Sequence, residues 1–212
     1  MAIRLFESVT NNSNVRLRVA MGHFATSHSH INYYVDLTMT KHRLSEAREA
    51  ALELCGHFKT STVIDTILCL DGTEVIATCL AEELTRGGHI NMNAHQTIYV
   101  MTPEHTTGSQ LLLRDNLVPM VAGKNVLILA ASVTTGYTAL GAIQAVDYYG
   151  GRVAGVASIF ATTEEVGGYR VRSCFNPGNL PDYASYLAHE CPQCKAGVRL
   201  DALVNGFGYS KI

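Results

Sequence analysis

Apolar runs of strand length alternate with helical patterns along most of this chain, and this alternation constrains its fold more than any other feature. The strand-length runs lie at 62–70, 96–101, 125–130 and 152–160. Helical patterns lie at 44–58, around Ile76, Leu80 and Leu84, and at 137–149. Nearly unbroken apolar strands are typical of a parallel sheet that helices cover on both faces. The sequence therefore predicts an α/β fold.

Two regions lack such a pattern. Residues 1–40 are polar and rich in histidine, and we expect irregular structure there. Residues 102–122 show no clean period, which favours a long mobile loop.

The bulk composition sets broad limits. The chain has 212 residues, 47% of them hydrophobic and 16% charged, which favours one domain with a large core. A formal net charge of -2 gives no electrostatic reason to expect nucleic acid or a membrane surface as a partner. The start "MAIRLFESVT" lacks the pattern of a signal peptide, and no apolar run approaches the roughly 18 residues of a membrane span. We therefore expect a cytoplasmic protein.

A polar turn, "SVTTGYT" at 132–138, joins an apolar strand to a helix. Ligands of parallel sheets bind beyond the carboxyl ends of the strands, and the start of a helix offers free N–H groups to an anion. Thr134, Thr135 and Thr138 add hydroxyl donors, and Gly136 lets the backbone close around a phosphate. Taken alone, the spacing fits a phosphate site and an ordinary threonine-rich helix cap equally well.

The longer segment "VLILAASVTTGYTA" resembles the phosphoribosyl-diphosphate motif of type I phosphoribosyltransferases, which has two acidic residues where this chain has Ala130 and Ala131. Three more segments resemble the orotate phosphoribosyltransferase branch. They are "SHSHINYYVD", which keeps Ser27, Tyr33, Tyr34 and Asp36; the loop Leu70, Asp71, Gly72 and Thr73; and "CPQCKAG" near the carboxyl end.

This resemblance implies a parallel five-stranded sheet flanked by helices, with a small hood, and a homodimer. The whole of 1–212 would form one domain, in which 1–40 and roughly 170–212 make the hood and peripheral segments. The resemblance assigns the phosphate to Thr134, Thr135, Gly136, Tyr137 and Thr138, the diphosphate to the loop 70–73, and the base to Tyr33, Tyr34 and Phe160.

Three departures from the family pattern fall on its chemistry. Ala130 and Ala131 offer no carboxylate to the ribose hydroxyls or to a magnesium-bound substrate. The loop that carries the family's basic cluster has only His105 and Arg114, with Lys124 beside the next strand. Threonines follow Phe160, where orotate enzymes carry an Asp-Arg pair that clamps the orotate carboxylate.

We therefore expect an orotate phosphoribosyltransferase-like protein that binds a phosphorylated ribose or a nucleotide, with transferase activity lost or much reduced. The alternative is an active phosphoribosyltransferase, a glycosyltransferase of nucleotide metabolism, that uses a base other than orotate. His105 and Asp71 are then the catalytic candidates, with Glu74 as a second carboxylate, and magnesium is implied only in that case. A third interpretation is a scaffold without a ligand. Acidic residues restored at 130 and 131 should improve binding of phosphoribosyl diphosphate if the rest of the pocket is intact.

The cysteines and histidines leave a metal site open. Cys191 and Cys194 form a CxxC pair, which Cys174 and His189 would complete as a zinc site; the other interpretation is a tight turn at Pro192. A second group, His23, His28 and His30, fits either a metal site or polar loop histidines, and we favour the latter. We expect no bound metal.

Overall fold

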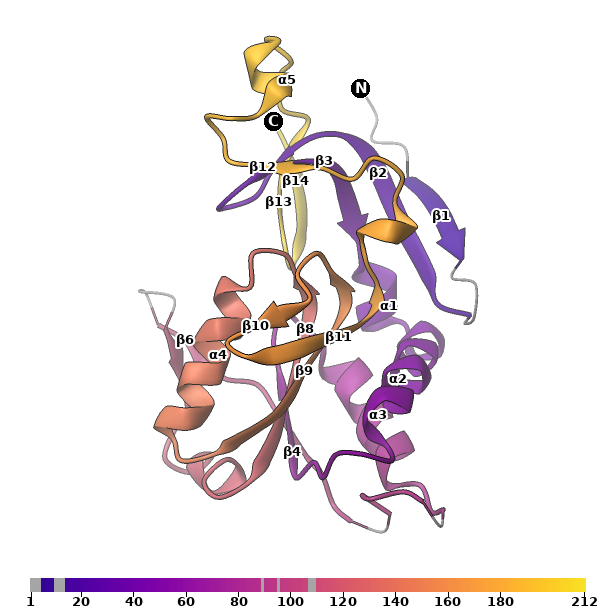
Figure 1. Cartoon of the computed structure of the whole chain (residues 1–212), viewed down its shortest axis with the longest axis vertical. Helices are drawn as coiled ribbons and strands as arrows, with labels where there is room; N and C mark the ends of the chain where they lie inside the picture. The colour runs from indigo at the N-terminus through magenta and orange to yellow at the C-terminus, as the bar shows by residue number, and fades with distance from the viewer. Residues whose placement is uncertain (1–4, 10–13, 89, 95, 107–109) are drawn as a thin grey trace.

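The computed structural model describes residues 5–9, 14–88, 90–94, 96–106 and 110–212 (Figure 1). Its larger sheet has the strand order β10–β11–β9–β8–β4–β5. The bounds are Glu165–Val166 for β10, Tyr169–Phe175 for β11, Arg152–Ala161 for β9, Asn125–Val133 for β8, Thr66–Cys69 for β4 and Tyr99–Met101 for β5. The last five strands of this order pair in parallel, and β10 is an antiparallel edge strand. The α/β fold with a five-stranded parallel sheet is confirmed.

Helices cover both faces of this sheet. Along β8, Leu127 and Leu129 face α2 (Leu44–Phe58) and α3 (Glu74–Thr85), whereas Val126 and Ile128 face α4 (Tyr137–Tyr148). Figure 1 shows α4 on one side of the sheet and the α2–α3 pair on the other. Because each strand is buried on both faces, its sequence is apolar throughout rather than alternating.

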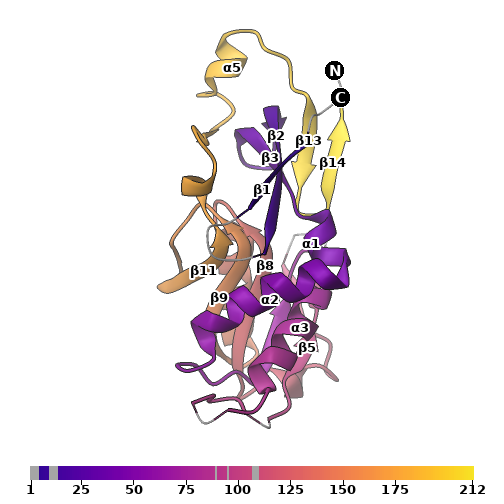
Figure 2. The ribbon, with the colours of Figure 1, turned by 90° about the vertical axis from the view of Figure 1, so that its right-hand side faces the viewer.

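Six further strands form a second sheet, which lies above the carboxyl ends of the first (Figures 1 and 2). Its order is β12–β3–β2–β13–β14, and β1 pairs with β2. The bounds are Ser185–Tyr186 for β12, His30–Asp36 for β3, Arg16–Ala25 for β2, Ala202–Asn205 for β13, Gly208–Lys211 for β14 and Leu5–Val9 for β1.

The expectation of irregular structure at 1–40 was wrong. This region forms β1, β2 and β3 and enters the short helix α1 (Thr38–His42). The strand pattern is hidden in the sequence because a bulge between Met21 and Phe24 shifts the register of β2 against β3, so alternation breaks in mid-strand.

The expected loop at 102–122 also contains regular elements. Strands β6 (Glu104–His105) and β7 (Leu111–Leu112) pair in antiparallel fashion, and a 3₁₀ turn follows at Val118–Met120. None of the helices in the described part of the chain combines the length and hydrophobicity that crossing a bilayer requires.

An ion pair joins the second sheet to the helical layer. The two terminal guanidinium nitrogens of Arg18 on β2, Nη1 and Nη2, donate to the Glu46 carboxylate on α2, at 2.6 and 3.0 Å. The side chains are mostly buried, with 14% and 17% exposed. The Arg18 hydrogen bond is the main reason that the pKa of Glu46 lies below its usual value.

We predict that Glu46→Gln lowers the free energy of unfolding by about 1–2 kcal/mol near neutral pH. Because the folded-state pKa of Glu46 is depressed, the ionised carboxylate stabilises the fold above the unfolded-state pKa, and this stability is lost as pH falls through the folded-state pKa. The variant should therefore lose less stability than the wild type below about pH 4.5. Urea unfolding across pH measures both effects, and exposed Glu82→Gln on α3 is the control. If the free energy of unfolding of the wild type and of Glu46→Gln changes with pH in the same way, the depressed pKa of Glu46 is contradicted.

Candidate functional site

A cavity of about 270 Å³ lies between the two sheets. The turns after the carboxyl ends of β4 and β8 and the end of β9 form its floor through Asp71, Ser132, Thr134, Thr135, Thr138 and Phe160. Residues of β3, the segment around Tyr183 and the turn 205–207 complete it. The cavity therefore occupies the edge of the parallel sheet where ligands bind in α/β proteins.

The turn before α4 depends on Gly136. This residue caps α4 with φ +79°, in the left-handed region. A Cβ at this position would lie 2.8 Å from Cγ2 of Val166, so a larger residue fits neither the backbone nor the space. Thr162 holds the turn from the other side, because its hydroxyl donates to the carbonyl of Thr134 at 2.9 Å.

The start of α4 borders the cavity and carries hydrogen-bond donors. Within the described part of the chain, the backbone N–H groups of Thr135, Gly136 and Tyr137 have no hydrogen-bond acceptor. The hydroxyl-bearing residues Thr134, Thr135 and Thr138 line the cavity beside them. The side chain of Tyr137 instead projects outward, 65% exposed, with the His28 ring 5.3 Å from its own. Amide and hydroxyl donors around a helix start form an arrangement that suits a phosphate.

The alanine pair is buried beneath this site. Ala130, 2% exposed, packs among the apolar residues on the α4 side, and Ala131, 1% exposed, packs on the α2–α3 side. Magnesium binds oxygen ligands, mainly carboxylates, phosphates and water. Two methyl groups supply none, and among the described residues Asp71 is the single carboxylate that lines the cavity. The residues at this position do not fit a resident magnesium ion.

Asp71 belongs to the loop 70–73, whose backbone is tightly fixed. Asp71 and Gly72 both have positive φ, 56° and 78°. The Thr73 hydroxyl hydrogen-bonds to the carbonyls of Leu70 and Leu129, at 2.9 and 3.0 Å. Burial raises the pKa of the Asp71 carboxyl group, while Lys41, His105 and the backbone N–H of Ala131 partly oppose the rise.

A buried lysine ties this loop to the carboxyl-terminal hairpin. The ammonium group of Lys41, whose residue is 3% exposed, donates to the carbonyl of Asp71 at 2.8 Å and to that of Gly206 at 2.5 Å. A Cβ on Gly206 would lie 2.9 Å from Cγ of Asp71, so the 205–208 turn is in close contact with the loop. Sequence reasoning missed Lys41 and this turn, because nothing local in the sequence indicates a contact across 165 residues.

The cations expected around a diphosphate lie elsewhere. Arg114 is exposed and paired with Glu104 at 2.7 Å. Lys124 immediately precedes the amino end of β8, at the opposite edge of the sheet. His105 is close enough to Asp71 to lower the pKa of that carboxyl group. No arginine or lysine within the described ranges lines the cavity.

Aromatic rings line the cavity beside its polar floor. The rings of Tyr33 and Tyr183 stack at a centroid distance of 6.4 Å, and Phe160 meets Tyr183 edge-on at 5.6 Å. The Tyr33 hydroxyl donates to the carbonyl of Pro181 at 2.9 Å, and burial raises the pKa of Tyr183 to about 12. Tyr34 also lines the cavity but packs against Phe24 and Tyr209 in the second sheet. Tyr183 was not found from the sequence, since its segment has no regular pattern.

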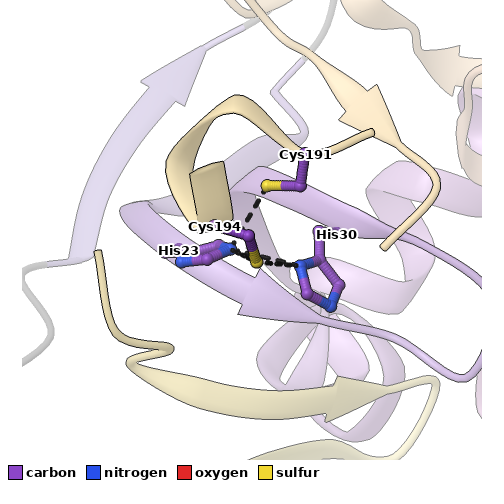
Figure 3. A group of neighbouring side chains, drawn as sticks. All are labelled: His23, His30, Cys191 and Cys194. Carbon is purple, nitrogen blue, oxygen red and sulfur yellow. Dashed lines mark hydrogen bonds between the residues drawn. The ribbon is translucent and has the colours of Figure 1, made fainter. Parts of the chain in front are cut away.

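The cysteines and histidines group differently from the set that CxxC suggested. His23 and His30 lie beside Cys191 and Cys194 (Figure 3). The other three candidates lie outside this group. Cys174 is buried in the core, where its thiol contacts the carbonyl of Ala50; His189 is exposed beside Glu190; and His28 is exposed beside Tyr137.

Comparison with known proteins gives matches by structure alone. No protein-family model matches the chain, and no curated protein matches its sequence. Orotate phosphoribosyltransferase of Mycobacterium tuberculosis H37Rv, in complex with Fe(III) dicitrate, is 21% identical with a TM-score of 0.54, over 78% of this chain and 93% of that chain. UMP synthase of Leishmania donovani is 18% identical with a TM-score of 0.55, over 85% of this chain and 36% of that chain.

A third similar structure is adenine phosphoribosyltransferase of Trypanosoma brucei, solved with AMP, pyrophosphate and ribose-5-phosphate. It is 13% identical with a TM-score of 0.52, over 76% of this chain and 78% of that chain. At identities of 13–21%, these matches establish the fold alone. The chain therefore has the fold of the type I phosphoribosyltransferases, as the resemblance of its motifs implied.

Proposed function

We propose that this chain binds a phosphorylated ribose or a nucleotide in the cavity between its sheets, and that its transferase activity is lost or much reduced. One observation carries the proposal: donor groups at the start of α4 and a set of aromatic rings line the same cavity of about 270 Å³. A phosphate and a planar ring are the two ends of a nucleotide.

The phosphate end is the better defined of the two. N–H groups without an acceptor among the described residues lie at the start of α4, three hydroxyl-bearing threonines line the cavity beside them, and the helix dipole favours an anion there. Because no lysine or arginine of the described residues lines the cavity, neutral donors would hold the phosphate. This arrangement suits the terminal phosphate of a ribose better than a free diphosphate.

The size and the walls of the cavity favour a single small ligand. Pockets for small molecules commonly measure about 300–1,000 Å³, so this cavity of about 270 Å³ lies just below that range. Tyr33, Tyr183 and Phe160 offer ring surfaces to a base or a ribose. The similar T. brucei enzyme was solved with ligands of this class, AMP and ribose-5-phosphate.

Three features support the loss of transferase chemistry. Alanines occupy the positions of the acidic pair, Arg114 is paired with Glu104, and the 205–208 turn is in contact with the loop 70–73. A cationic sugar transition state needs negative charge nearby, and a leaving diphosphate needs positive charge. The cavity supplies little negative or positive charge.

The alternative, an active enzyme with a different base, is supported by Asp71 and His105. Asp71 lines the cavity, and His105 is close enough to it to influence the pKa of its carboxyl group. A turnover assay with phosphoribosyl diphosphate and a panel of bases separates the two functions, because product from any base would favour the alternative.

We predict saturable binding of ribose 5-phosphate or a nucleoside monophosphate in isothermal titration calorimetry. Thr135→Val and Thr138→Val should each weaken binding by about 10- to 150-fold, because a hydrogen bond to a charged group contributes about 1.5–3 kcal/mol. Thr78→Val, on the exposed face of α3 and away from the cavity, is the matched control. The proposal fails if none of these ligands gives a saturable signal, or if the control weakens binding as much as the two cavity variants.

A further inference from the structure

Four potential metal ligands converge outside the cavity already described. His23 comes from β2, His30 from β3, and Cys191 and Cys194 from the start and interior of α5 (Pro192–Lys195). One nitrogen from each histidine and the two thiol sulfurs all lie within 4.8 Å of one another. Figure 3 shows the four side chains pointing toward a common centre.

The separations match the edges of a tetrahedral metal site. A zinc ion with Zn–N bonds of about 2.0–2.1 Å and Zn–S bonds of about 2.3 Å has N···N edges of about 3.3 Å and N···S edges of about 3.6 Å. Here Nε2 of His23 lies 3.2 Å from Nδ1 of His30. The N···S separations are 3.4 and 3.6 Å from His23 to the two sulfurs, and 3.2 Å from His30 to Cys194.

The protein also orients the His23 ring. Nδ1 of His23 lies 3.0 Å from the carbonyl oxygen of Val198, which can only accept a hydrogen bond. The proton of the neutral ring therefore sits on Nδ1, and the lone pair of Nε2 faces the sulfurs and His30. A carbonyl that fixes the second nitrogen of a histidine is the usual outer contact of a metal ligand.

The backbone around His23 supports the same geometry. His23 sits within the bulge of β2, which interrupts the alternation of side chains along the strand. The backbone of His23 also pairs with Asp201, through its N–H to the carboxylate and its carbonyl to the Asp201 N–H, both at 2.8 Å. The bulge and these bonds keep His23 beside the segment that carries the cysteines.

That segment has little else to hold it. Between β12 and β13, residues 187–201 are exposed or partly exposed apart from Cys191, which is 1% exposed. The helix α5 spans four residues, which is too short to be stable by itself. Small segments without an apolar core are commonly fixed by a metal or a disulfide. Both cysteines are free thiols, and both face histidine nitrogens.

We propose that His23, His30, Cys191 and Cys194 bind one structural zinc ion. Two thiolates and two imidazoles are a donor set that zinc prefers, and four protein ligands leave no position open for a substrate. The ion joins residues 187–201 to β2 and β3. Because this segment leads into β13, which pairs with β2 and carries the 205–208 turn, zinc also supports one wall of the cavity. The inference does not depend on the function proposed for that cavity.

Metal analysis of the full-length protein tests the site. Protein purified under reducing conditions without added chelator should contain about one zinc ion per chain. His23→Ala and Cys191→Ser should each abolish the stoichiometric zinc. His189→Ala, which removes the exposed histidine near the CxxC pair, should retain it and serves as the matched control. Loss of zinc in His189→Ala together with retention in His23→Ala would overturn the assignment.

Cobalt gives a test that does not depend on the variants folding well. Wild-type protein stripped by a chelator and refilled with Co²⁺ should show the visible bands of tetrahedral cobalt and the near-ultraviolet charge-transfer band of thiolate ligands. Zn²⁺ added to the cobalt form should remove the visible and charge-transfer bands. Zn²⁺ added to the stripped protein should raise its melting temperature. Absence of these bands, or a mass that shows Cys191 and Cys194 joined as a disulfide in the reduced preparation, would overturn the proposal.

Discussion

Ala130→Asp should lower the free energy of unfolding by about 3–5 kcal/mol at neutral pH. Ala130 is 2% exposed and belongs to the apolar cluster of Ile128, Val133 and Ile143; its register partner on β9, Ser158, offers a carboxylate a neutral hydroxyl but no charge. A charge buried there is uncompensated, so we expect the new carboxyl group to have a raised pKa. The loss of stability should therefore shrink as pH falls and the group becomes neutral. Urea unfolding at pH 7 and pH 5 measures both effects.

Ala122→Asp is the control for this substitution, since Ala122 is exposed before β8 and should lose little stability. The result bears on the acidic pair that the family motif carries. In this chain apolar side chains pack closely around Ala130. An aspartate at this position should therefore destabilise the core rather than improve ligand binding. If Ala130→Asp keeps wild-type stability and binds phosphoribosyl diphosphate more tightly, the packing argument is wrong and the pocket can accept the acidic residue of the family motif.

Lys41→Met should lower the free energy of unfolding by about 2–4 kcal/mol, because it leaves the carbonyls of Asp71 and Gly206 without their charged donor. Burial lowers the pKa of Lys41, while Asp71, Glu74 and Asp36 partly oppose this effect. The loss of stability should affect the 205–208 turn locally as well as the whole fold. Hydrogen exchange at 205–208 should become faster relative to the rest of the second sheet.

Lys211→Met is the control, since Lys211 is exposed on β14. Unchanged stability and unchanged exchange at 205–208 in Lys41→Met would show that the hairpin does not depend on this lysine. It would also weaken the argument that the hairpin turn restricts the loop 70–73.

The sequence predicted the parallel sheet well because burial on both faces leaves a local mark. Helix α2 occupies the predicted range 44–58, and β8 and β9 begin at or next to the predicted residues. Strand β11 was missed because Arg170 and Arg172 interrupt its apolar pattern. The second sheet was missed because the bulge in β2 breaks the alternation of its strands and because two of its pairings, β13 with β2 and β12 with β3, join opposite ends of the chain.

The candidate site was predicted in the same uneven way. The turn 132–138 and the CxxC pair are local motifs and could be found from spacing. Lys41 and Tyr183 could not, because their roles depend on contacts that only the folded chain creates. His23 lies 168 residues before Cys191 and His30 lies 164 residues before Cys194, so the sequence suggested the nearer His189 and the buried Cys174 instead.

Phosphorus NMR of phosphoribosyl diphosphate mixed with the protein tests the central claim most directly, because one sample reports binding and turnover together. With magnesium and a panel of nitrogenous bases present, we predict that the protein broadens or shifts the 5-phosphate resonance, that Thr135→Val suppresses this change, and that no pyrophosphate is released above the protein-free rate. Base-dependent release of pyrophosphate would contradict the loss of transferase activity. A spectrum that the protein leaves unchanged would contradict the binding site itself.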